Sequence, residues 1–120
     1  MRRNLSWVLC AASLAAVSCP TFAISGLEFD RRAQAYERMA LSGERGVSQD
    51  DKENGIWFLS YVAVTTERED DVCPPIGVTK DQLAAIVSKY VRDHPEQWHK
   101  DSYVLALTAL HSAFPCPKKK

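Results

Sequence analysis

Two cysteines, Cys73 and Cys116, constrain the fold more than any other feature, because they enclose two stretches with helical periodicity. The stretches cover about residues 79–93 and 95–114, and their short connection predicts an αα-hairpin. In such a hairpin the start of one helix lies beside the end of the other, so the cysteines meet at the open end. We therefore predict a disulfide that closes a loop of about 44 residues and contributes roughly 4 kcal/mol in the chain-entropy estimate.

The first 23 residues have the features of a secretory signal peptide. Arg2 and Arg3 form a positively charged start, and residues 5–17 are mostly apolar and carry no charge. Small residues at the two positions that a signal peptidase reads favour cleavage after Ala23. The apolar run is too short to span a bilayer as a mature helix.

A lipoprotein anchored through Cys19 is the alternative for this segment, but the usual leucine is missing and Pro20 would follow the lipidated residue. We expect residues 1–23 to be removed and residues 24–120 to form one domain. Cleavage would remove Cys10 and Cys19 and leave an even pair of cysteines in an exported protein. Such a pair is most simply a disulfide.

The charge balance excludes some classes of partner. The chain has 15 basic and 15 acidic residues, so removal of Arg2 and Arg3 leaves 13 against 15, a net charge of −2. Nucleic-acid-binding proteins present a basic face, and this composition provides none. We find no other segment that could cross a membrane, so no membrane association is expected after signal cleavage. A chain of this length can bury a modest core.

Two helices are predicted before the cysteine-enclosed region. Residues 26–41 place Phe29, Ala33, Tyr36 and Ala40 at helical spacing among many charges, which predicts an amphipathic helix. The next stretch, from about residue 51 to 68, is apolar nearly all round. Its β-branched residues admit a strand, but its length and its helical neighbours favour a buried helix.

The helices of the hairpin have clearer boundaries. Thr79 and Gln82 form a capping-box pattern ahead of an apolar stripe. The last helix is predicted from Pro95 to about Phe114, and its core face is expected to consist of Tyr103, Leu107, Leu110 and Phe114. The expected fold is therefore all-α: a small four-helix domain with a C-terminal αα-hairpin stapled by one disulfide.

The segment HPEQWH, residues 94–99, has the composition of a metal site but the wrong spacing. His94 and His99 are five residues apart, about 140° around a helix, whereas zinc peptidases place two histidines four residues apart on one face. Pro95 suits the first position of a helix, with His94 at its N-cap and Glu96 in the first turn. The segment therefore predicts a helix start, and we expect no metal or other cofactor.

Other catalytic patterns are also missing. The sequence contains no nucleophile elbow, phosphate-binding loop or dinucleotide fingerprint. Cys73 as a nucleophile would have to remain a thiolate in an oxidising compartment, where the disulfide is favoured. We therefore expect a protein that is not an enzyme. A small hydrolase built on HPEQWH is the competing hypothesis.

Residues 73–117 carry a more specific pattern, CPPIGVTKDQLAAIVSKYVRDHPEQWHKDSYVLALTALHSAFPCP. In order, it contains a cysteine and proline, G-V-T, Q-L, an I-V-x-x-Y stripe, H-P-E, a later histidine and A-L-x-x-A-F-P-C. This pattern resembles the C-terminal signature of the Rap1a/Tai family of immunity proteins. The N-terminal half departs from the family, because the segment 60–64 keeps Tyr61 but lacks the glycines often found there.

The resemblance implies a small α-helical protein of the Gram-negative periplasm. Characterised relatives bind and inhibit a toxin delivered by type VI secretion, typically a peptidoglycan amidase with a cysteine nucleophile. Some relatives act as homodimers, so the resemblance also allows a homodimer here. The alternative is a structural or adaptor protein of the periplasm that keeps the fold without a toxin partner.

The loop between the second and third predicted helices is the expected surface for a protein partner. An inhibitor of a cleft enzyme needs a protruding and fairly rigid segment, because preorganisation limits the entropy lost on binding. This loop contains two prolines and a disulfide cysteine, and its acidic residues could steer it toward a basic rim. These acids are Glu67, Glu69, Asp70 and Asp71. The next choice is the exposed face of the last helix around Trp98, His99 and Ser102.

Overall fold

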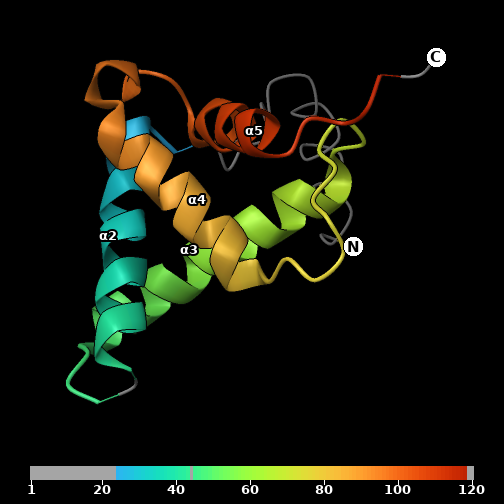
Figure 1. Cartoon of the computed structure of the whole chain (residues 1–120). Coiled ribbons are helices and arrows are strands. Elements are labelled where there is room, and N and C mark those ends of the chain that lie inside the picture. Colours follow the sequence, from blue (N-terminus) through green and yellow to red (C-terminus); the bar gives the residue numbers. More distant parts are fainter. Residues whose placement is uncertain (1–23, 44, 119–120) are drawn as a thin grey trace, which may run out of the picture.

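The computed structural model describes residues 24–43 and 45–118, and the predicted signal peptide, residues 1–23, lies outside the described residues. The described part is helical and contains no strand, only two isolated bridges between extended residues. Its elements are α2 (Gly26–Ser42), α3 (Gln49–Arg68), α4 (Lys80–Asp93), the short 3₁₀-helix η1 (Pro95–Gln97) and α5 (Ser102–Ala113) (Figure 1). The predicted all-α class is confirmed.

The helix starts follow local capping signals in the sequence. Ser25 and Ser48 accept hydrogen bonds from the backbone amides three residues on, at the starts of α2 and α3. Thr79 forms the predicted capping box, since its hydroxyl accepts from the Gln82 amide at 3.2 Å while the Gln82 side chain accepts from the Thr79 amide at 2.7 Å. The strand alternative for residues 51–68 is wrong, because this stretch forms most of α3.

The core lies where α2 and α3 cross and where the hairpin of α4 and α5 covers them (Figure 1). Phe29 and Phe58 are fully buried, with ring centroids 4.9 Å apart. Gly55 allows the two helices to approach closely, since a Cβ there would lie 3.1 Å from the Tyr36 Cα. The hairpin adds further fully buried side chains, among them Val87, Val91, Leu105 and Leu110.

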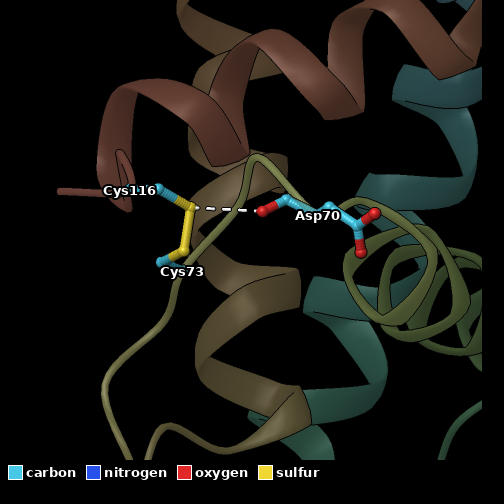
Figure 2. Close-up of a disulfide and its surroundings, with 3 residues drawn as sticks. All are labelled: Asp70, Cys73 and Cys116. Carbon is cyan, nitrogen blue, oxygen red and sulfur yellow. Dashed lines mark hydrogen bonds between the residues drawn. A yellow bond between two sulfur atoms is a disulfide. The ribbon is translucent and has the colours of Figure 1, made fainter. Parts of the chain in front are cut away.

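The predicted disulfide is present at the open end of the hairpin. Cys73 and Cys116 are bonded, and their Cα atoms lie 4.9 Å apart (Figure 2). The two segments also pair through their backbones beside the disulfide. Val72 forms a bridge with Pro115, and the Cys73 amide donates to the Phe114 carbonyl at 2.9 Å. The segment after α3 and the segment after α5 are therefore joined by covalent and hydrogen bonds.

The predicted start of the last helix is wrong. Only η1 begins at Pro95, with His94 at its N-cap position but without a side-chain capping bond, and α5 begins at Ser102. The chain at the start of α2 forms hydrogen bonds with backbone groups that a continuous helix would use internally. Ser102 N–H donates to the Ile24 carbonyl, and Gly26 N–H donates to the Lys100 carbonyl. Asp101 then caps α5 by accepting from the Val104 amide at 3.0 Å.

The predicted core face of this helix is only partly correct. Leu110 is fully buried, but Tyr103 is exposed, and Leu107 and Phe114 are half-buried at the edge of the core. The other buried residues of α5 are Ser102, Leu105, Ala106 and Ala109. The 12 residues of α5 include no Asp, Glu, Lys or Arg. Without charged positions to mark the exposed side, the spacing of apolar residues could not identify which side of the helix is buried. Ala40, predicted on the core stripe of α2, is exposed near the end of that helix.

Candidate partner-binding site

The loop between α3 and α4, residues 69–79, is fixed at several points along its length; we call it the acidic loop. Val72 turns its side chain into the core and is 6% exposed. Cys73 is held by the disulfide, and Val78 packs against the edge of the core. Thr79 ends the loop as the cap of α4. A chain attached this often loses little conformational freedom on binding.

The first half of the acidic loop is a tight turn from Glu69 to Val72. The Val72 amide donates to the Glu69 carbonyl at 3.3 Å, which places Asp70 and Asp71 at the two central positions of a β-turn. Both aspartates are exposed. Figure 2 shows the Asp70 carboxylate pointing away from the disulfide. The Cys116 Sγ lies 3.3 Å from the Asp70 carbonyl oxygen, and because a disulfide sulfur carries no hydrogen, this is a sulfur–oxygen contact.

The four acids predicted as partner-binding residues do not share one environment. Glu67, in the last turn of α3, is exposed like Asp70 and Asp71, and within residues 24–43 and 45–118 none of the three forms an ion pair. Glu69 is half-buried and accepts a hydrogen bond from the Tyr103 hydroxyl. This hydrogen bond raises the pKa of Tyr103, because it favours the protonated phenol. Glu69 is thus engaged within the protein.

The second half of the acidic loop exposes an apolar residue that the sequence reasoning missed. The Val78 amide donates to the Pro75 carbonyl at 3.2 Å, and Gly77 has a φ of 100°, which this turn requires and glycine adopts without strain. Ile76 lies between them and is fully exposed. The signal in the sequence was an isoleucine placed between two prolines and a glycine, which together indicate a turn.

A groove lies between α3 and the start of α4. Its volume is about 300 Å³, and its lining residues are Leu59, Ser60, Ala63, Val64, Glu67 and Lys80. Its lining mixes apolar and polar side chains, and Glu67 and Lys80 place one charge of each sign on it. Glu67 thus faces a groove that no residue of the acidic loop lines.

Trp98 and His99, the second predicted partner-binding pair, lie at the opposite end of the hairpin from the acidic loop (Figure 1). Trp98 is half-buried, and its indole N–H donates to the Val91 carbonyl at 2.8 Å. His99 is exposed, with Nδ1 3.1 Å from the Glu96 carbonyl oxygen. Ser102, predicted on the same exposed face, is fully buried at the start of α5, so that part of the prediction is wrong. The structure does not bring Trp98 and His99 together with the acids, so the two sets are separate candidate surfaces.

The HPEQWH segment makes its interactions locally. His94 Nδ1 lies 2.8 Å from Glu96 Oε1, and the His94 ring packs against the Tyr90 ring in a tilted arrangement, with centroids 4.3 Å apart. The hydrogen bond with His94 lowers the pKa of the Glu96 carboxyl. Among the residues that the structure describes, no group of three or more histidine, cysteine, aspartate or glutamate side chains could hold a metal ion.

The comparisons with known proteins give one match. A model of the Rap1a immunity proteins matches residues 29–116. No curated protein and no solved structure matches the chain. In the described part of the chain, none of the helices has both the length and the apolar character needed to cross a membrane.

Proposed function

The chain belongs to the Rap1a immunity protein family, and we propose that it binds and inhibits a toxin delivered by a type VI secretion system. The family match carries this proposal, because it spans residues 29–116 and includes α3, the acidic loop and the hairpin. An immunity protein acts by binding, so the proposed role requires no chemistry of its own, and the proposal includes no enzymatic activity.

The proposed toxin is a peptidoglycan amidase with a cysteine nucleophile in a cleft. The acidic loop supports this class of target, because it is anchored by Val72, the disulfide and Val78 and presents the fully exposed Ile76. Exposure of an isoleucine to water is unfavourable, and its burial in a partner would contribute about 1.5–3 kcal/mol before the costs of association. The loop would occupy the cleft and deny substrate access to the nucleophile.

The exposed acids of the loop supply the proposed electrostatic part of recognition. Asp70 and Asp71 have no ion-pair partner among the described residues, and a partner with a basic rim would supply one. Charges of this kind raise the association rate more than the final affinity. The surface around Trp98 and His99 is the second candidate for this contact.

The proposed location is the periplasm, where residues 1–23 would have served as the export signal and residues 24–120 would form the mature domain. The disulfide supports an oxidising compartment. The mature protein would act there as a monomer or as a homodimer on its cognate toxin.

Co-expression tests the proposal. Immunity proteins are normally encoded beside their toxins, so the adjacent gene product is exported to the periplasm of a host with and without this protein. Growth should fail without the protein and recover with it, and the two purified chains should form a stable complex. If the adjacent product is toxic but neither binds this protein nor is neutralised by it, the adaptor alternative replaces the immunity role.

A further inference from the structure

The turn that carries Asp70 and Asp71 is attached to α5 on its C-terminal side. We call residues 69–72 the acidic turn. Val72 is buried and forms a bridge with Pro115, while the adjacent Cys73 amide donates to the Phe114 carbonyl at 2.9 Å. The disulfide reinforces the same junction (Figure 2). The exit of the turn is therefore set by the chain that follows α5.

The N-terminal side of the acidic turn is attached to α5 by a single side chain. α3 ends at Arg68, and Glu69 leaves the helix with extended backbone angles of φ −100° and ψ 110°. Its carboxylate accepts a hydrogen bond from the hydroxyl of Tyr103, which is 34 residues further along the chain in the first turn of α5. The residues at both ends of the acidic turn are thus bonded to α5 or to the chain that directly follows it.

Burial does not account for the position of Tyr103. The residue is 42% exposed on the outer side of α5, although its spacing had predicted the core. Its polar end reaches the one acid of the loop that is half-buried and leaves the two central aspartates free. The hydrogen bond from a neutral phenol to a carboxylate is charge-assisted, which makes it stronger than a bond between neutral groups.

We propose that Tyr103 is a positioning residue that holds Glu69 and thereby orients the Asp70 and Asp71 carboxylates toward a guanidinium or ammonium group of the partner. The identity of the partner rests on the proposed function, whereas the positioning itself belongs to the free protein. Two adjacent carboxylates repel each other, and a turn whose entry is held only by the end of α3 would distribute them over several orientations. Fixing both ends reduces the entropy that binding would otherwise lose.

Amide hydrogen exchange in the free, disulfide-bonded mature protein tests the positioning without any partner. The Val72 amide closes the turn onto Glu69, so its exchange rate reports the turn directly. Tyr103→Phe removes only the hydroxyl and should raise this rate roughly threefold to tenfold, the range that the loss of one hydrogen bond implies. Glu69→Gln, which keeps the side-chain length but weakens the acceptor, should act in the same direction.

Tyr90→Phe provides a matched control. The Tyr90 hydroxyl donates to the Gln97 side chain at 3.0 Å, at the other end of the hairpin. This variant should leave the Val72 exchange rate unchanged, and all three variants should keep the wild-type helical content. An unchanged Val72 rate in both Tyr103→Phe and Glu69→Gln, or an equal increase in Tyr90→Phe, would overturn the proposal.

A double-mutant cycle with the adjacent gene product tests the consequence for binding. Tyr103→Phe should weaken the affinity roughly threefold to tenfold, and it should have no further effect when Asp70 and Asp71 are already asparagine. Additive losses would mean that Tyr103 contacts the partner itself and would overturn the positioning role. If wild-type protein does not bind the adjacent product, the proposed function fails, and the exchange experiment still decides whether Tyr103 positions the turn.

Discussion

The two ends of the α4–α5 hairpin are both rich in polar side chains, but they use them differently. At the closed end Trp98 donates to a backbone carbonyl, and His94 and Glu96 bond to each other. At the open end the disulfide and backbone pairing hold the chain, and Asp70 and Asp71 remain exposed. A surface whose backbone is fixed by other means keeps its side chains available for a partner.

Removal of the disulfide should have the largest effect on the open end. Replacing both Cys73 and Cys116 with alanine should lower the free energy of unfolding by roughly 4 kcal/mol, because the open loop regains its entropy in the unfolded chain. Urea unfolding of the oxidised wild type, the reduced wild type and the variant measures the difference. A loss below about 1 kcal/mol would show that backbone pairing alone secures the open end.

The closed end should respond to packing instead. A Cβ at Gly26 would lie 2.6 Å from the Trp98 Cα, too close without a backbone shift. Gly26→Ala should therefore lower the free energy of unfolding by about 1–3 kcal/mol, as overpacking does. Thermal unfolding measures this, with Arg31→Ala as a control, since that side chain is 68% exposed on the same helix. Equal stability of both variants would mean that the closed end is loosely packed.

Charge reversal should show which end of the hairpin binds the partner. Asp70→Lys combined with Asp71→Lys should weaken affinity for the adjacent gene product about tenfold at low salt, equivalent to about 1.4 kcal/mol. The effect should shrink as salt is added, because exposed charges are screened. The melting temperature should not change.

The control for charge reversal is the double variant of Asp93→Lys and Glu96→Lys at the closed end, where both acids are exposed but paired with Lys89 and His94, so its melting temperature is measured as well. Titration calorimetry at two salt concentrations measures both pairs. If the closed-end variant lowers the affinity more than the Asp70 and Asp71 variant does, the interface lies at the surface around Trp98 and His99.

The smallest expected effect is on the stability of the fold at low pH. The hydrogen bond with His94 lowers the pKa of the Glu96 carboxyl below its ordinary 4.5. A lowered folded-state pKa stabilises the fold above the ordinary value, and this contribution is lost as the pH falls through the lowered pKa. Glu96→Gln should therefore lose less stability than wild type between about pH 5 and pH 3. Melting temperatures across this range measure it, and parallel curves would contradict the role of this pair.

The sequence by itself determined the features that depend on neighbours within one helical turn. The Thr79–Gln82 box joins residues three positions apart, so its pattern was readable from the sequence and is confirmed. The all-α class followed from periodicity and polar contrast. The disulfide followed because the predicted hairpin brought two distant cysteines to one end. The exposed acids could also be located, although their role in binding stays a prediction.

The tertiary structure decided which side α5 buries and, together with the local cap at Asp101, where this helix begins. The pairing of Ile24 and Gly26 with residues 100–102 interrupts the chain after η1, and no local signal marks a contact between segments so far apart. The uncharged α5 then takes the orientation that packing allows, which exposes Tyr103 and brings it to Glu69. Exposure of Ile76 has the same origin, because a turn in the structure, and not the hydropathy of one residue, directs that side chain into solvent.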